Sequence, residues 1–147
     1  LQGDEPSIDV DDIIDLNKKM IKTNSNLGTL ASKIRDISDL ENNNVVKVIT
    51  ESSLNEVSFP RAISFLRNSK HKDNIYHHIG IYCYKKKTLE KFVALNQSKN
   101  EIQNQLEQLR ALDNHIDINV SLAKSSPIGI DTKEDYLALK KIMEYKN

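Results

Sequence analysis

The stretch that decides the fold is His77-His78-Ile79-Gly80-Ile81-Tyr82-Cys83-Tyr84. Its apolar residues recur at every second position, and residues with that period lie on one face of a strand. The alternation predicts a buried strand over residues 77–84, with His78, Tyr82 and Tyr84 together on the opposite face. That face is open to two interpretations, a ligand site lined by polar tips or an ordinary half-exposed strand surface. Cys83 is expected to be a small buried hydrophobic residue rather than a reactive thiol.

The segments before this strand predict the rest of a sheet. Residues 45–49 are rich in β-branched side chains, which favour strands. Residues 27–34 and 56–59 predict two more strands, and residues 51–55 are expected to form the turn of a hairpin between 45–49 and 56–59. The polar, basic residues 66–75 indicate an exposed loop.

Apolar residues at helical spacing predict the helices. A helix is expected over residues 9–24, with Asp9 as its N-cap, and another over residues 86–95. Ser98 and Glu101 form a capping box, which predicts a third helix running to about Asp113. The side chains expected to face inward are Val10, Ile13, Ile14, Met20 and Ile21 in the first helix, Leu89, Phe92 and Val93 in the second, and Ile102, Leu106 and Leu109 in the third.

Two carboxylates stand where a short apolar segment is followed by a helix start. Asp4 lies in Leu1-Gln2-Gly3-Asp4-Glu5-Pro6, before the first helix. Asp131 follows residues 128–130, and Thr132 is a suitable N-cap for a last helix to about residue 145. Ligands of α/β proteins gather at the carboxyl ends of strands, and Mg²⁺ prefers carboxylate oxygens. A further strand is predicted over residues 116–122, before Asp131. The sequence therefore predicts that Asp4 and Asp131 approach each other across the sheet. The alternative is a solvated turn with a helix-capping acid.

Composition narrows the class of protein. The 147 residues are enough for one domain with its own core. Lysine plus arginine and aspartate plus glutamate both number 21, so the sequence does not indicate a nucleic-acid-binding protein. The single cysteine permits no intrachain disulfide and favours a reducing compartment. No apolar run approaches the roughly 20 residues of a membrane-spanning helix, so no membrane insertion is expected. Strands alternating with helices around an antiparallel meander predict an α/β sheet with an antiparallel insertion.

Five stretches together resemble the 3-deoxy-manno-octulosonate cytidylyltransferase family, also called CMP-Kdo synthetases. They occur in the family's order and spacing and are Gln2-Gly3-Asp4-Glu5-Pro6, Val45-Val46-Lys47-Val48, His78-Ile79-Gly80-Ile81-Tyr82, Leu106-Glu107-Gln108-Leu109-Arg110 and Gly129-Ile130-Asp131-Thr132-Lys133-Glu134-Asp135. The resemblance implies a Rossmann-like nucleotidyltransferase fold with a mixed sheet flanked by helices and a dimer-forming insertion. It also implies a cytoplasmic enzyme of lipopolysaccharide biosynthesis that forms CMP-Kdo and pyrophosphate from CTP and Kdo, and a homodimer at full length.

The resemblance also implies roles for particular residues. Asp4 and Asp131 match the family's magnesium ligands, so Mg²⁺ is the expected cofactor. Residues matching positions that contact the sugar acid are Gln2, His78, Tyr82, Glu107 and Gln108. The resemblance places the sugar site between the 78–82 strand and the 106–110 helix. Arg61 resembles a substrate-side arginine, although Pro60 and Ile63 depart from the family's pattern around it.

The resemblance covers only the later part of the family's sequence. Residues 1–147 are therefore expected to be the C-terminal part of a single cytidylyltransferase domain, truncated before its triphosphate-binding segment and inactive alone. Two alternatives are a cytidylyltransferase for another sugar acid, such as sialic acid, and a non-catalytic dimerisation or binding remnant. The 78–82 and 106–110 stretches argue against the first. The coding sequence upstream of Leu1 would decide the second.

Overall fold

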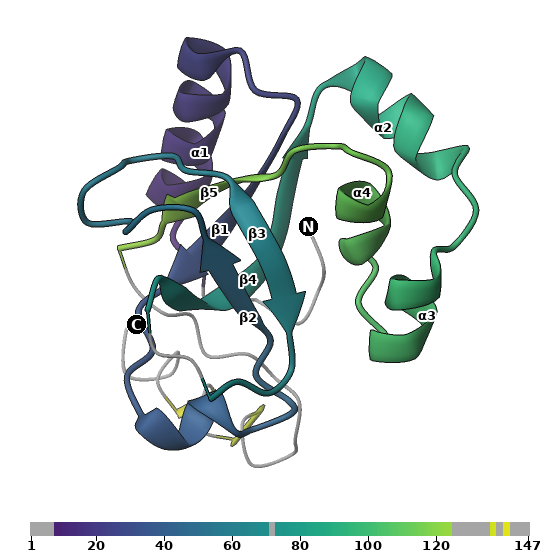
Figure 1. The fold of residues 1–147 in the computed structure, drawn as a ribbon. Coiled ribbons are helices and arrows are strands. Elements are labelled where there is room, and N and C mark those ends of the chain that lie inside the picture. The colour runs from purple at the N-terminus through teal and green to yellow at the C-terminus, as the bar shows by residue number, and fades with distance from the viewer. Residues whose placement is uncertain (1–7, 71–72, 125–135, 138–139, 142–147) are drawn as a thin grey trace.

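In the computed structural model, which describes residues 8–70, 73–124, 136–137 and 140–141, a five-stranded mixed sheet is flanked by helices (Figure 1). The helices are α1 (Val10–Thr23), η1 (Ile37–Leu40, a 3₁₀ helix), α2 (Lys86–Val93), α3 (Lys99–Asn104) and α4 (Leu109–Asp113). The strands are β1 (Leu27–Ser32), β2 (Lys47–Thr50), β3 (Ala62–Leu66), β4 (Ile75–Tyr84) and β5 (Asn119–Leu122). None of the helices in these ranges is long and apolar enough to cross a membrane.

The strand predicted over residues 77–84 is β4, and it lies at the centre of the sheet. The strand order is β3-β2-β4-β1-β5. β4 pairs antiparallel with both β2 and β1, β2 pairs antiparallel with β3, and β1 pairs parallel with β5. This confirms the predicted α/β class with a mixed sheet and an antiparallel part. The strands around β4 are shorter than the predicted segments.

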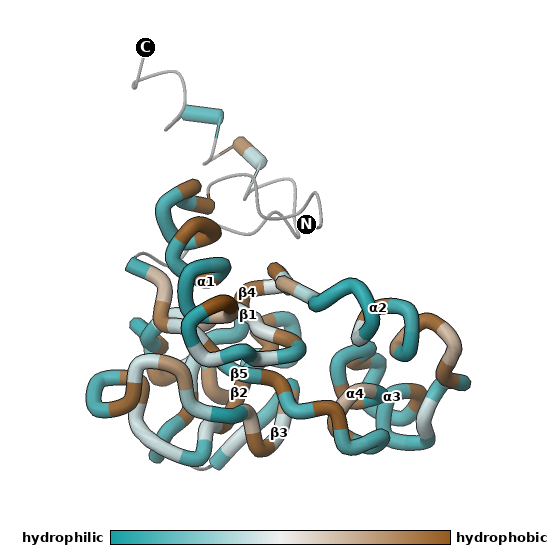
Figure 2. The backbone as a smooth tube through the Cα atoms, turned by 90° about the horizontal axis from the view of Figure 1, so that it is seen from above, coloured by the Kyte–Doolittle hydropathy of each residue, from teal (hydrophilic) through white to brown (hydrophobic). Residues whose placement is uncertain are grey.

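Helix α1 covers one face of the sheet. The side chain of Asp9 accepts the Asp11 N–H at 2.9 Å and caps the start of α1, as predicted. Leu16 and Met20 pack with Leu30, Ile79 and Ile81 into one cluster of the core. In Figure 2, α1 lies over β1 and β4, whereas α2, α3 and α4 form a separate group to one side.

Side chains of α1 and Phe59 pack closely over the glycine at position 28 of β1. A Cβ atom on Gly28 would lie 2.8 Å from Met20 Sδ and 3.0 Å from Phe59 Cζ. These distances are shorter than side-chain carbons normally reach. Gly28 therefore sets the depth at which α1 lies on the sheet.

The other core cluster packs against the opposite face of β4. Tyr76 belongs to this cluster and Tyr82 and Tyr84 pack against it, together with Phe92 of α2 and Leu109 of α4. The apolar residues Ile79 and Ile81 belong instead to the α1 side. The alternation predicted from the sequence thus separates the two faces of β4 correctly.

The inward face predicted for α1 is wrong in part. Val10, Ile14 and Ile21 are exposed, whereas Asp12, Leu16 and Met20 are buried. A buried carboxylate is tolerated because both oxygens of Asp12 accept the backbone N–H of Lys124, at 3.0 and 3.2 Å. The same error affects the later helices, because Leu89, Val93 and Ile102 are exposed, while Phe92, Leu106 and Leu109 are buried as predicted.

The strand predicted over residues 56–59 is also wrong. The strand that follows β2 in the hairpin is β3, and residues 56–59 form turns and bends between β2 and β3. The Ser53 carbonyl accepts the N–H groups of Glu56 and Val57, which removes both from strand pairing. Pro60 has no N–H to donate to a ladder. The predicted hairpin exists, but its second strand begins at Ala62.

The helix predicted from Ser98 to Asp113 is two helices. α3 ends at Asn104, its C-cap Gln105 has a left-handed φ of 54°, and α4 begins at Leu109. A left-handed residue cannot continue a right-handed helix. The chain therefore turns back on itself between α3 and α4. The apolar segment 128–130 lies outside the described residues, and of the last predicted helix only residues 136–137 and 140–141 are described.

Candidate functional site

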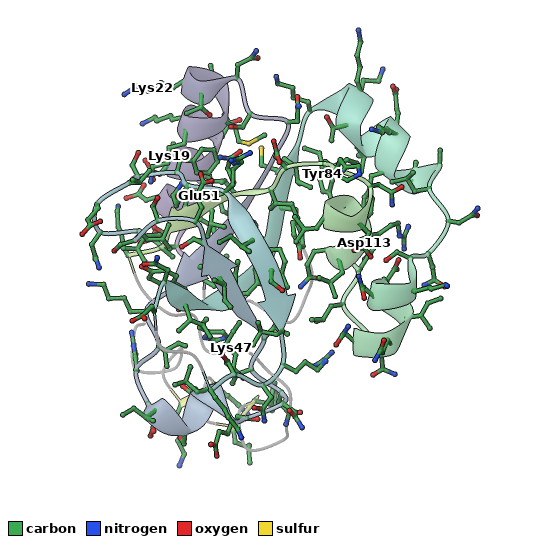
Figure 3. All side chains as sticks on the ribbon, in the orientation of Figure 1. Lys19, Lys22, Lys47, Glu51, Tyr84 and Asp113 are labelled. Carbon is green, nitrogen blue, oxygen red and sulfur yellow. The ribbon has the colours of Figure 1, made fainter. Side chains whose placement is uncertain are left out.

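A row of rings runs along one face of β4 and continues onto α2. Neighbouring ring centroids lie 5.0 Å apart for Phe65 and His78, 5.5 Å for His78 and Tyr82, 6.1 Å for Tyr82 and Tyr84, and 5.8 Å for Tyr84 and Phe92. The predicted common face of the three β4 residues is confirmed. Figure 3 shows Tyr84 beside α4, at the edge where the sheet meets the helices.

His78 is buried and neutral. Its side chain is 7% exposed, and its Nε2 atom lies 3.0 Å from Oγ1 of Thr29. Burial, with a smaller contribution from the charge of His77, lowers the pKa of His78 to about 3. A neutral imidazole has one N–H donor and one acceptor nitrogen. His78 therefore offers hydrogen bonds rather than positive charge.

The two tyrosines remain protonated. Burial raises the pKa of Tyr82 above its usual range and that of Tyr84 to about 12. The charge of Tyr84 and then that of Glu107 raise the pKa of Tyr82 further, and the charge of Glu107 also raises the pKa of Tyr84. Tyr82 and Tyr84 are thus O–H donors at neutral pH.

The helical side of the site is held by an ion pair between Glu101 of α3 and Arg110 of α4. Arg110 Nε lies 2.8 Å from Glu101 Oε2, and a second guanidinium nitrogen contacts Oε1. Both side chains are largely buried, and the Arg110 guanidinium lies 4.8 Å from the centre of the Phe92 ring. Hydrogen bonds from Arg110, foremost among several partners, lower the pKa of Glu101 to about 2. The pair ties both helices to the end of the ring row.

Glu101 also completes the predicted capping box. Ser98 Oγ accepts the Glu101 N–H at 3.1 Å, and the Glu101 carboxylate accepts the Ser98 N–H at 3.1 Å. The left-handed turn at Gln105 allows Arg110 to reach back to this carboxylate. An open hollow of about 610 Å³ lies over this turn, lined by Gln97, Glu101, Ile102, Gln105, Glu107 and Arg110.

Of the two predicted sugar contacts on the 106–110 segment, only Glu107 lines the hollow. Its side chain is 63% exposed and lies 3.8 Å from Arg110. Gln108 is buried and immediately precedes α4. Gln108 does not line this hollow, and its predicted contact with the sugar stays a prediction.

Arg61 is not brought to the ring row. Its Nε lies 3.1 Å from Glu51 Oε2, its backbone N–H donates to the same carboxylate, and Asp117 lies 3.9 Å away. These hydrogen bonds lower the pKa of Glu51. The Arg61 guanidinium is thus engaged at the β2–β3 connection, and its predicted role toward substrate stays a prediction.

The remaining predicted residues, Gln2, Asp4 and Asp131, lie outside the described residues. The first turn of α1, which follows Asp4 in the sequence, contacts Lys124, which precedes Asp131 in the sequence. Asp12 in the first turn of α1 accepts the N–H of Lys124, and Lys124 Nζ lies 3.1 Å from Asp11. Within residues 8–70, 73–124, 136–137 and 140–141, no cluster of three or more His, Cys, Asp or Glu side chains is arranged to hold a metal ion.

Sequence reasoning missed two buried polar residues. Thr29 lies among apolar residues of β1, and its hydroxyl contacts His78 and the carbonyls of Ile79 and Ile81. Lys47 is completely buried in β2, and its ammonium donates to the carbonyls of Asn42, Val45 and Arg67. A polar residue within an apolar strand was the available signal for Thr29.

Comparison with known proteins decides the family. The sequence profile described as "Cytidylyltransferase" matches residues 1–118. The chain belongs to the cytidylyltransferase family. The 3-deoxy-manno-octulosonate cytidylyltransferase of Bartonella tribocorum is 40% identical over 146 residues, covering 97% of this chain and 59% of that protein. The protein of the same name from Thermodesulfovibrio yellowstonii is 40% identical over 144 residues, covering 92% of this chain and 55% of that protein.

The fold comparison agrees with the family. A solved structure of CMP:2-keto-3-deoxy-manno-octonic acid synthetase complexed with CTP superimposes with a TM-score of 0.86 and 26% sequence identity. The match covers 100% of this chain and 61% of that chain. The chain therefore spans about three fifths of the cytidylyltransferases that it resembles, and the shared portion includes both the ring row and the α3–α4 turn.

Proposed function

We propose that the protein carrying this chain transfers the cytidylyl group of CTP to the sugar acid Kdo, forming CMP-Kdo and pyrophosphate. The observation that supports the proposal is that His78 and Tyr82 lie side by side in the ring row, with ring centroids 5.5 Å apart, while Glu107 lines the hollow together with Arg110, whose guanidinium lies over Phe92 at the end of that row. Kdo has several hydroxyls and a carboxylate, so its site needs both donors and acceptors. The family and the names of its relatives supply the nucleotide and the reaction.

The residues of this chain act by positioning the sugar. Tyr82 donates a hydrogen bond from a hydroxyl that stays protonated at neutral pH, and Glu107 accepts hydrogen bonds from sugar hydroxyls. The Glu101–Arg110 pair holds the turn that presents Glu107. Catalysis of phosphoryl transfer is largely positioning and charge stabilisation, so a fixed wall on the sugar side contributes to the rate.

Asp4 and Asp131 are the residues that would hold Mg²⁺. Both supply the carboxylate oxygens that Mg²⁺ prefers. The contacts of Lys124 with Asp11 and Asp12 support the assignment, because they bring together the segments leading to the two aspartates. When bound, Mg²⁺ would neutralise charge on the triphosphate. A homodimer, a cytoplasmic location and a role in lipopolysaccharide synthesis belong to the same proposal.

The sugar site is tested by substitutions in the full-length protein that its gene encodes. Glu107→Ala and His78→Ala should raise the KM for Kdo several-fold and leave the KM for CTP nearly unchanged. Glu90→Ala removes an exposed carboxylate of α2 that does not line the hollow, and it should change neither constant. Equal losses for both substrates would indicate a folding defect, and no loss would remove the assignment.

The reaction and the metal are tested separately. Product formation is followed with CTP and either Kdo or sialic acid, and turnover of sialic acid alone would contradict the proposed sugar. Asp4→Asn and Asp131→Asn should each weaken Mg²⁺ binding measured by calorimetry, whereas Asp73→Asn, in the loop before β4, should not. Unchanged Mg²⁺ affinity in both variants would exclude them as ligands.

A further inference from the structure

The pairing of β1 with β4 is irregular at Thr29. Thr29 pairs with Tyr82, but the next residue, Leu30, pairs with Ile79, so Gly80 and Ile81 are passed over. Strand irregularities leave backbone groups without a ladder partner. Here the Thr29 hydroxyl lies 2.7 Å from the Ile81 carbonyl oxygen and 3.3 Å from that of Ile79. The side chain of Thr29 therefore occupies the place of a missing backbone donor.

The single proton of that hydroxyl decides which nitrogen of His78 carries hydrogen. At 2.7 Å from the Ile81 oxygen, the proton lies on the Thr29–Ile81 line, since two oxygens without a proton between them repel each other at that distance. His78 Nε2 lies 3.0 Å from the same hydroxyl oxygen and must then be the donor. A neutral imidazole has one N–H, so Nδ1 of His78 carries the lone pair.

The acceptor nitrogen has no partner among the described residues. None of them makes a hydrogen bond to His78 Nδ1, although the side chain is 93% buried. The rings beside it belong to Phe65 and Tyr82. Buried polar atoms are nearly always hydrogen-bonded, so an acceptor without a partner among the described residues is available to a donor from a ligand.

We propose that Thr29 is a positioning residue that fixes His78 as the Nε2–H tautomer, so that Nδ1 accepts a hydrogen bond from a hydroxyl of the sugar substrate. A carboxylate has only lone pairs to offer and is excluded from Nδ1. His78 thus selects a hydroxyl of the substrate and leaves its carboxylate to other groups. The identity of the sugar rests on the proposed function, whereas the tautomer rests on the contacts of Thr29 alone.

The test compares Thr29→Val, which keeps the shape but removes the hydroxyl, with Thr29→Ser, which keeps the hydroxyl. The matched control is Thr50→Val. Thr50 lies on β2, is as buried as Thr29, and donates to the Ser52 carbonyl at 2.7 Å. The tautomer of His78 is measured by ¹⁵N NMR of the labelled protein without ligand. The kinetic constants for Kdo and CTP are measured in the same preparations.

In the unsubstituted protein, Thr29→Ser and Thr50→Val, His78 should carry its proton on Nε2. Thr29→Val should shift protonation toward Nδ1 and raise the KM for Kdo about tenfold, which corresponds to about 1.4 kcal/mol. The KM for CTP should stay unchanged, and Thr29→Ser should restore the KM for Kdo.

Protonation of Nδ1 in the unsubstituted protein would overturn the proposal, even if Thr29→Val failed to fold. An unchanged tautomer or an unchanged KM for Kdo in folded Thr29→Val would overturn it as well. A protein that shows the expected tautomers but makes no CMP-Kdo would instead overturn the proposed function and keep the role of Thr29 in setting the tautomer.

Discussion

The β4 side and the α3–α4 side of the ring row hold their polar residues in opposite ways. On β4, His78 is buried without charge and depends on a neutral hydroxyl from the neighbouring strand. On α3–α4, Glu101 and Arg110 are nearly as buried but fully charged, and each compensates the other. The difference follows from the partners, because a central strand offers backbone carbonyls and hydroxyls, whereas a helix pair brings two long side chains face to face.

The comparison shows that burial alone does not set the protonation state of a side chain. Burial lowers the pKa of His78 to about 3, so the neutral form is kept. The hydrogen bonds from Arg110 outweigh burial at Glu101 and lower its pKa to about 2, so the charged form is kept. The ring row is therefore flanked by uncharged polar groups on β4 and by an ion pair on α3–α4.

The largest effect is expected from breaking the charged side. Arg110→Met leaves the buried Glu101 carboxylate without its partner, and loss of one member of a buried pair costs about 3–5 kcal/mol of unfolding free energy. Lys86→Met is the matched control, because Lys86 and Glu90 form an exposed pair 3.9 Å apart. It should cost less than about 1 kcal/mol. Urea unfolding followed by circular dichroism measures both, and equal losses would contradict the difference in burial.

A smaller effect is expected from titrating the neutral side. The folded pKa of His78, about 3, lies below its unfolded value of 6.5, so the unfolded chain binds more protons between these pH values. The stabilising contribution of neutral His78 should therefore be fully present above pH 6.5. As the pH falls below 6.5, the free energy of unfolding should decrease by up to about 1.4 kcal/mol per pH unit. Glu101 adds a loss only below pH 4.5, its unfolded value, down to about 2.

Urea unfolding at pH 7.5, 6 and 5 isolates the contribution of His78, because all three values lie above 4.5. His78→Phe should remove most of the change in unfolding free energy between pH 6.5 and 5. His115→Asn leaves the contact between Thr29 and His78 intact, so this variant should keep the pH dependence. His115 has a φ of 56°, which asparagine tolerates. A slope that survives His78→Phe would mean that His78 is not the group responsible.

The smallest effect is expected from the cap of α3. Ser98→Ala removes the acceptor of the Glu101 N–H and should cost about 1 kcal/mol of unfolding free energy. Asp9→Ala is the matched control at the start of α1, where the Asp9 side chain accepts the Asp11 N–H. Only Ser98→Ala should also increase amide hydrogen exchange at the α3–α4 turn. Increased exchange there in both variants would show that the cap does not act locally.

The sequence predicted what depends on local patterns. The alternation in 77–84 identified β4 and its two faces, and Ser98 with Glu101 identified the start of α3. It did not predict the break at Gln105, because a left-handed glutamine has no sequence signature comparable to glycine. The ion pair between Arg110 and Glu101 depends on that break. The role of Thr29 depends on a shift in strand pairing, which is a property of two strands together.

Burial of charge misled the sequence interpretation in a similar way. Apolar spacing in α1 indicated the wrong face, because Asp12 is buried through its contact with a residue 112 positions later. The Arg61 guanidinium pairs with the exposed carboxylate of Glu51, just after β2, and its predicted role toward substrate stays a prediction. Such pairs form only when the chain is folded, so spacing along the sequence carries no signal for them.

The enclosed amine of Lys47 makes it a chemical reporter of local opening. Its three carbonyl partners come from the loop before β2 and from the residue after β3, so an acylating reagent reaches the amine only when these segments separate. Burial lowers the pKa of Lys47 only while the amine is enclosed, and once released it reacts as an ordinary exposed lysine amine. The rate at which Lys47 is labelled, read by mass spectrometry, therefore measures how often this end of the sheet opens while the rest stays folded.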